Sequence, residues 1–156
     1  GRIISARKKA RIMQKIVLNI TGTQQMGRDK DKIEMTTVGT MRNDGKAYII
    51  RYKEHPEPPA PPIKVNLRIA KDGSFVEMSR NMGSQSSSIA IEKSNRNLCA
   101  YKTPYGNMLM GIYGKDIEIK TGEKNGSFYF GYDIDINGAV SSQNTVKIDY
   151  SVTGVN

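Results

Sequence analysis

The sequence has little of what disulfides, metal centres and membrane spans require. Cys99 is the only cysteine and His55 the only histidine, so the chain can form neither an intrachain disulfide nor a zinc site of nitrogen and sulfur ligands. We expect Cys99 to be a small, unreactive core residue, and a reducing cytoplasmic location fits its being unpaired. No apolar run approaches the roughly 20 residues that span a bilayer, so we predict no membrane partner.

The motifs of common enzyme classes are also missing. The sequence contains no P-loop, no glycine-rich loop opening a helix and no Ser-His-Asp set. Asp133 and Asp135 share a strand face with Tyr129, opposite an aromatic stripe, and we predict that this face is solvated. It offers too few converging oxygens for calcium. The sequence therefore predicts a protein that is not an enzyme and that has no cofactor and no metal.

Positive charge is unevenly spread. The net charge is +9, but the first twelve residues (GRIISARKKARI) contain five basic residues and no acid; subtracting these five leaves +4 on the other 144 residues, an ordinary surface excess. The segment lacks the apolar region of a secretory signal. We expect residues 1–12 to be a disordered basic leader or extension, with Met13 as the natural start. A phosphate-binding arm is the less favoured alternative, because the rest of the chain argues against nucleic acid.

Apolar and polar residues alternate with a period of two along most of the chain, which is typical of half-buried strands. Short alternating runs are separated by turn residues such as Asp44-Gly45 and Asp72-Gly73. About ten strands result, with almost no helical periodicity. A stretch of five prolines within residues 54–62 (EHPEPPAPP) excludes a strand there and predicts a stiff connecting loop. The polar stretch at residues 83–88 predicts a loop or a weak edge strand.

Consecutive hairpins of this kind predict an up-and-down meander. A long meander exposes two strand edges unless it closes on itself. We therefore predict one all-β domain over residues 13–156, a single closed antiparallel up-and-down barrel of about 8–10 strands. A β-sandwich is the alternative.

Alternation places two charged residues on the inner face of this barrel. Within residues 46–54, Tyr52 and Glu54 share a face that carries no base, which predicts that this face is internal. By the same argument Arg80 is internal, because it shares a face with Val76 and Met78. A lone internal charge is costly, so we expect Glu54 and Arg80 to lie close together in a hydrated barrel mouth. Arg80 could hold a carboxylate or phosphate there, or the pair could be a structural plug.

Two further residues are candidates for the wall of the same pocket. Tyr101 and Thr103 share a face of one predicted strand with Cys99, and a tyrosine combines an apolar ring with a polar hydroxyl. A tyrosine suits a barrel core equally well. The candidate ligand-binding residues are therefore Glu54, Arg80, Tyr52, Tyr101 and Thr103.

The order of several short motifs resembles that of a known family. The motifs are residues 37–40 (TVGT), 48–54 (YIIRYKE), 78–80 (MSR) followed by Gly83, 101–106 (YKTPYG), 131–134 (GYDI) and 144–148 (NTVKI). In this order, over roughly residues 14–152, they resemble the YwiB-like family of bacterial domains of unknown function. The resemblance implies a calycin-like (lipocalin-like) β-barrel and a cytoplasmic bacterial origin, and it implies no established activity.

Two functions follow as expectations. The first is non-enzymatic binding of a small anionic or amphipathic ligand at the barrel mouth. The second is a structural or protein-interaction module that acts as a homodimer with a plugged barrel. The sequence names neither the ligand nor the oligomeric state.

Overall fold

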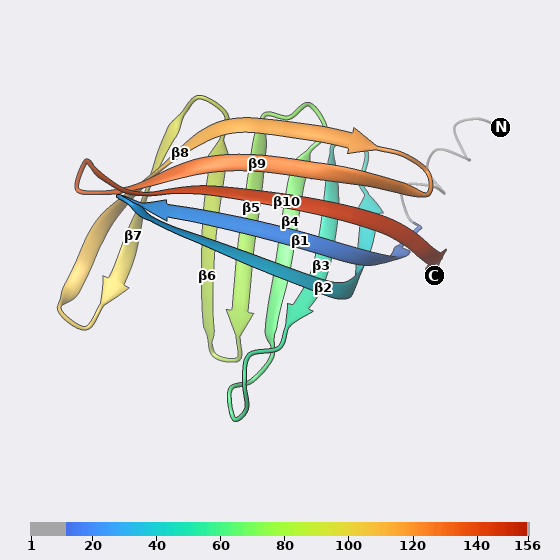
Figure 1. Cartoon of the computed structure of the whole chain (residues 1–156), viewed down its shortest axis with the longest axis horizontal. Coiled ribbons are helices and arrows are strands. Elements are labelled where there is room, and N and C mark those ends of the chain that lie inside the picture. The colour runs from blue at the N-terminus through green and yellow to red at the C-terminus, as the bar shows by residue number, and fades with distance from the viewer. Residues whose placement is uncertain (1–11, 156) are drawn as a thin grey trace.

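The computed structural model describes the backbone of residues 12–155, and the side chains of that range except those of residues 101–103. Residues 1–11 of the expected leader lie outside the described residues, and the first strand starts at Gln14, directly after Met13. The strands, labelled in Figure 1, are β1 (Gln14–Met26), β2 (Asp29–Asn43), β3 (Ala47–Glu54), β4 (Ile63–Ala70), β5 (Phe75–Met82), β6 (Gln85–Glu92), β7 (Arg96–Thr103), β8 (Gly106–Thr121), β9 (Asn125–Ile136) and β10 (Ala139–Val155).

All ten strands form one antiparallel sheet in the order β6-β5-β4-β3-β2-β1-β10-β9-β8-β7. Every strand pairs with its neighbour in sequence except across β6 and β7, while β1 pairs with β10. The sheet therefore wraps into a nearly closed up-and-down barrel, which confirms the predicted fold class. Among residues 12–155 no helix is long and apolar enough to cross a membrane.

The segment that follows β6 meets β8 at a short closing seam. Lys93 bridges Gly114 in a parallel arrangement, the Ser94 amide donates to the Gly114 carbonyl at 2.9 Å, and the Gly114 amide donates to the Asn95 carbonyl at 3.1 Å. No ladder joins β6 to β7 in the described residues. One side of the barrel is therefore closed only at the seam.

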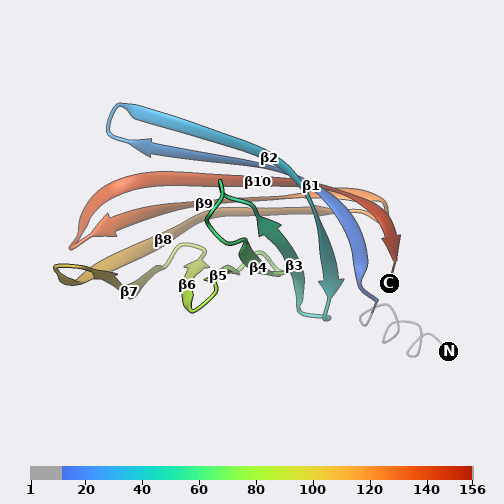
Figure 2. The ribbon, with the colours of Figure 1, turned by 90° about the horizontal axis from the view of Figure 1, so that it is seen from below.

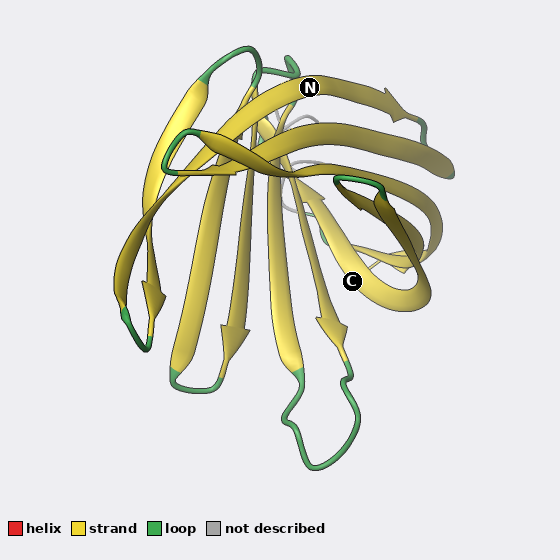
Figure 3. Cartoon of the chain, turned by 60° about the vertical axis from the view of Figure 1, so that its left-hand side comes forward, coloured by secondary structure: helices red, strands yellow, loops and turns green. Residues whose placement is uncertain are grey.

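The barrel is flattened into two layers that cross steeply. Figures 1 and 2 show the long strands β8, β9, β10, β1 and β2 running across the shorter strands β3, β4, β5 and β6. The hairpins β1–β2, β9–β10 and β7–β8 extend past the shorter strands on one side (Figure 2). Residues 12–155 consist of strands and loops (Figure 3). The long strands thus form a cover that overhangs one end of the barrel.

Alternate side chains from both layers fill the centre of the barrel. The most deeply buried of these inward residues are large and apolar: Ile16, Leu18, Ile50, Val65, Leu67, Ile69, Val76, Ile91, Ile112, Phe128, Phe130 and Ile148. They form one continuous cluster. Burial of this apolar surface is the dominant favourable term for folding.

Two local predictions have clear outcomes. Residues 55–62 connect β3 to β4 outside the sheet, as the prolines indicate. The stretch Gln85–Ser88 belongs to β6, which is the edge strand of the sheet. The apolar residues on either side of Gly114 belong to one strand, β8, whose register shifts between Gly114 and Ile117. This bulge lets Ile112 and Ile117 face the same core although they are five positions apart, an odd offset that would place them on opposite faces of a regular strand.

Candidate ligand site at the open end of the barrel

One end of the barrel is largely filled by aromatic residues. Phe128 contacts Tyr48 and Tyr150, with ring centroids 5.5 and 5.7 Å away. The Tyr150 hydroxyl donates to the Gly122 carbonyl at 3.1 Å, and the Tyr48 hydroxyl lies 3.1 Å from the Thr121 hydroxyl. These rings fill much of this end, and a groove of about 530 Å³ lined by Met41, Tyr48, Thr121 and Tyr150 remains beside them.

The opposite end carries an ion pair between Glu54 and Arg80. Arg80 Nη2 lies 3.1 Å from Glu54 Oε1, and the two side chains are 47% and 22% exposed respectively. Glu54 ends the inward stripe of β3, and Arg80 lies opposite Val65, a fully buried core residue of β4. The predicted proximity of Glu54 and Arg80 is confirmed. A half-exposed pair of this kind stabilises the fold by at most about 1 kcal/mol.

Tyr52 and Tyr132 lie beside this ion pair. Tyr52 shares an inward row with Val65 and Arg80 across β3, β4 and β5. Burial raises the pKa of the Tyr52 hydroxyl to about 12, the charge of Glu54 adds to the rise, and that of Arg80 opposes it. Burial also raises the pKa of Tyr132, again opposed by Arg80. The guanidinium of Arg80 is therefore within electrostatic reach of both hydroxyls, which stay protonated at neutral pH.

Several inward apolar side chains are only partly covered. They pack against the core but remain partly exposed: Met35, Ile63, Met78, Ile89, Cys99, Met110, Ile134 and Val146. On β5 the exposure of the inner face rises steadily, from Val76 in the core through Met78 to Arg80. The inner face is thus an apolar surface that ends at a charged pair.

Cys99 is half-buried and packs against this apolar cluster, so it lies at the edge of the core rather than inside it. The other two candidates on its strand, Tyr101 and Thr103, have side chains outside the described residues. Only their backbone position in β7 is defined.

A buried polar group on β10 was not predicted. Asn144 and Ser142 face inward on β10 and are both buried. The Asn144 amide donates to Ser142 Oγ at 3.0 Å, and it receives a hydrogen bond from Gln24 at 3.4 Å. The signal was present, because both residues continue the alternation of Ile148 and Val146 toward the start of the strand. They add polar groups to the inner face beside Tyr132, the Cα partner of Asn144.

The prediction that Asp133 and Asp135 lie on a solvated face is wrong. Asp135 is buried, and Arg96 reaches it across Gly111 with two hydrogen bonds of 2.7 and 2.6 Å. These bonds lower the pKa of Asp135. Lys115 Nζ lies 3.1 Å from Asp133 Oδ1. Cations from β7 and β8 cover these carboxylates, which the pattern of β9 alone does not reveal.

Comparison with known proteins places this geometry in a family. A family model described as "Domain of unknown function (DUF1934)" matches residues 18–148, most of the chain. The chain belongs to the DUF1934 family. The DUF1934 fold is shared with the crystal structure of the ywiB protein from Bacillus subtilis, at a TM-score of 0.74 and 18% identity over 98% of this chain and 99% of that one. The predicted resemblance to the YwiB-like family is thus confirmed. A search of curated proteins gives no match.

The family and the structural likeness establish the fold of this DUF1934 domain and no chemistry. Within residues 12–155, no three His, Cys, Asp or Glu side chains come together as metal ligands would. What the open end offers is a half-exposed arginine, two protonated tyrosines and a partly covered apolar surface. This combination suits recognition of a ligand with one charged end and one apolar part.

Proposed function

We propose that this DUF1934 domain is a non-enzymatic binding protein that holds a small amphipathic anion at the open end of its barrel. The observation that carries the proposal is the incompletely covered inner face, which ends at Arg80. A ligand that covers this apolar surface removes it from water, and that burial favours binding.

The apolar part of the ligand would lie on the methionines. Met35, Met78 and Met110 project inward from β2, β5 and β8, and all three are partly exposed. Unbranched methionine side chains adapt their shape to a ligand at little cost. β6, which pairs with β5, and β7, which pairs with β8, share no ladder in the described residues, and we infer that a ligand enters between them.

The charged end of the ligand would meet Arg80. Glu54 is paired with Nη2, and a guanidinium has five donor hydrogens, so donors remain for a carboxylate or phosphate. The hydroxyls of Tyr52 and Tyr132 are protonated and can donate as well. In this arrangement Glu54 orients Arg80 and at the same time offsets part of its charge.

Calorimetric titration with decanoate tests the proposal, with decyltrimethylammonium as a probe of equal chain length and opposite charge. Arg80→Gln should weaken decanoate binding at least about tenfold, because a charge-assisted hydrogen bond contributes about 1.5–3 kcal/mol. Glu54→Gln should strengthen it about two- to fivefold, because the competing charge is removed. The control Lys32→Gln removes an equal charge from the exposed pair with Glu34, and it should leave the affinity for decanoate unchanged.

Arg80→Gln and Glu54→Gln are expected to change the affinity for decanoate in opposite directions, and this distinguishes a binding site from a structural plug. A structural plug predicts that both variants lower stability and that neither affects binding. Absence of decanoate binding by the unmodified protein, or equal binding by Arg80→Gln, would overturn the proposal.

A second candidate function is a homodimeric interaction module, favoured by an apolar patch on the outer face. Leu98, Leu109 and Tyr113 are exposed around Gly111 on β7 and β8, and exposed Val140 of β10 lies on the far side of the Arg96–Asp135 ion pair. On this reading a second copy of the chain covers the patch. Sedimentation equilibrium tests it: a dimer that Leu98→Glu and Val140→Glu dissociate supports the module, and a monomer at all concentrations excludes it.

A further inference from the structure

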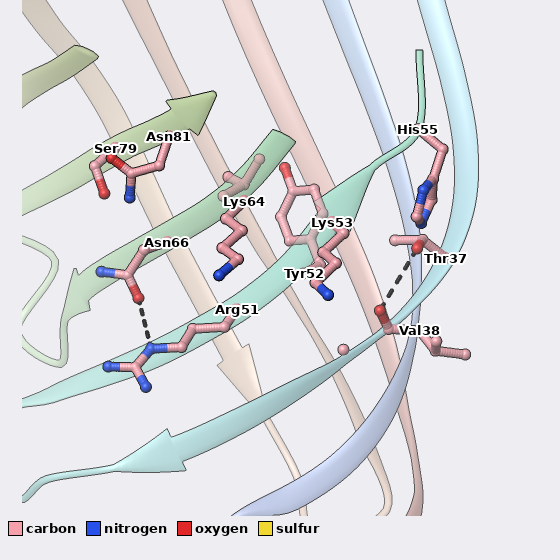
Figure 4. A pocket seen from close by; sticks show the side chains of 12 residues that line it. Thr37, Val38, Arg51, Tyr52, Lys53, His55, Lys64, Asn66, Ser79 and Asn81 are labelled. Atoms are coloured by element: carbon pink, nitrogen blue, oxygen red, sulfur yellow. Dashed lines mark hydrogen bonds between the residues drawn. The ribbon is translucent and has the colours of Figure 1, made fainter. Parts of the chain in front are cut away.

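A groove on the outer side of β3, β4 and β5 carries charges that the open end of the barrel does not use. The ladder between β2 and β3 stops at the pair Gly39–Tyr52, and β2 then diverges from β3. The resulting groove has a volume of about 670 Å³, within the usual range for small-molecule sites. Figure 4 shows its lining: Arg51, Lys53 and Lys64 extend to one side of the strands, and the ring of Tyr52 points the other way.

The outward side chains form two rows of hydrogen-bond donors. Arg51, Asn66 and Ser79 are successive Cα partners across β3, β4 and β5. Lys53, Lys64 and Asn81 form the second row in the same way. None of the residues that line the groove is an acid, and Ser88 and Ser86 of β6 continue the two rows.

The lysines of the groove have no carboxylate partner among the described residues. Arg68, Arg96 and Lys115 each lie within 3.1 Å of a carboxylate oxygen. In the described part of the chain, neither Lys53 nor Lys64 has such a partner, although they face each other directly across two strands. Like charges in this position destabilise a sheet. Local arrangements that cost stability are expected where a protein binds something.

One hydrogen bond orients the guanidinium of Arg51. Its Nε donates to Asn66 Oδ1 at 3.0 Å, which leaves the two terminal nitrogens without an acceptor among the residues described. A guanidinium fixed at one nitrogen presents a planar pair of donors, which matches two oxygens of one phosphate. The ammonium groups of Lys53 and Lys64 then supply the positive charge that a multiply charged anion requires.

We propose that this groove is a binding site for a small anion carrying one or more phosphate groups. Arg51 holds one phosphate through its terminal nitrogens, Lys53 and Lys64 neutralise it, and Asn66, Ser79 and Asn81 supply further donors. The site lies on the opposite face of the strands that bear Glu54 and Arg80, so it stands independently of the function proposed above.

Titration of the full chain with inorganic pyrophosphate at low and physiological ionic strength tests the site, with citrate as a carboxylate of similar charge. The variant Lys53→Gln/Lys64→Gln should bind pyrophosphate at least about tenfold more weakly. The matched control Lys120→Gln/Lys147→Gln removes the same charge from two exposed strand lysines and should retain affinity within about twofold. The groove variant should also melt at a higher temperature than the control, because the like-charge pair is removed.

Three results would overturn the assignment. Failure of the unmodified protein to bind pyrophosphate would remove the site. Equal loss of affinity in both double variants would show an effect of net charge alone. Citrate binding as tight as pyrophosphate would show that the groove does not select phosphate. The Arg80→Gln variant should bind pyrophosphate as tightly as the unmodified protein. Binding in the groove is thereby distinguished from binding at the open end of the barrel.

Discussion

Replacing Gly114 with alanine is expected to open the seam that closes the barrel. A Cβ atom at position 114 would overlap the carbonyl group of Glu92. Two backbone hydrogen bonds cross the seam at this residue, one from Ser94 and one to Asn95. Each contributes about 0.5–1.5 kcal/mol net, so Gly114→Ala should lower the free energy of unfolding by about 1–3 kcal/mol. For a domain of this size that corresponds to a melting temperature about 2–12 °C lower.

The matched control for this variant is Gly22→Ala, also in a strand, where the nearest atom to the added Cβ lies 3.9 Å away. It reports the general effect of alanine on the unfolded chain, which is mildly stabilising. Thermal unfolding gives the stability, and amide hydrogen exchange at Ser94 gives the local opening. If Gly114→Ala melts at the same temperature as Gly22→Ala and the Ser94 amide stays protected from exchange, the seam does not hold the barrel together.

Three further predictions concern titratable groups. The raised pKa of Tyr52 contributes about 2–3 kcal/mol to the free energy of unfolding, which is present below pH 10 and lost as pH rises toward 12. In urea unfolding, the free energy of unfolding of Tyr52→Phe should therefore fall less steeply over this pH range than that of the unmodified protein. Hydrogen bonds from two backbone amides hold the pKa of Asp44 at about 2; Asp44→Asn should therefore cost about 1–2 kcal/mol above pH 4 and less as pH falls toward 2. Gly111→Ala places a Cβ against Arg96 and Asp135, so carboxyl NMR titration should show the pKa of Asp135 rising; an unchanged value would contradict the bidentate geometry.

Alternation along single strands was sufficient to predict the inner mouth. On β3 the period of two places Tyr52 and Glu54 on the face of Ile50, and on β5 it places Arg80 on the face of Val76, as the structure has them. The pairing of Glu54 with Arg80 followed from the cost of an isolated internal charge. Both inferences need only local geometry and one energetic rule.

Features that depend on register between strands were not predictable in the same way. The groove needs Lys64 opposite Lys53, and the eight residues between β3 and β4 leave that register undetermined from sequence. Arg96 reaches Asp135 only because Gly111 lies between them, a relation among three strands. A one-residue slip would reverse every such face, so these contacts had to come from the structure.

The central claim, that the open end of the barrel is a ligand site, is tested most directly by NMR of methionine methyl groups during titration with decanoate. Met35, Met78 and Met110 are partly exposed residues of the inner face, Met41 is buried in the core and Met26 lies exposed at the end of β1. The account predicts saturable shifts of the first three methyl signals and unchanged signals from Met41 and Met26. Shifts confined to Met26, or equal small shifts at every exposed methionine, would contradict it.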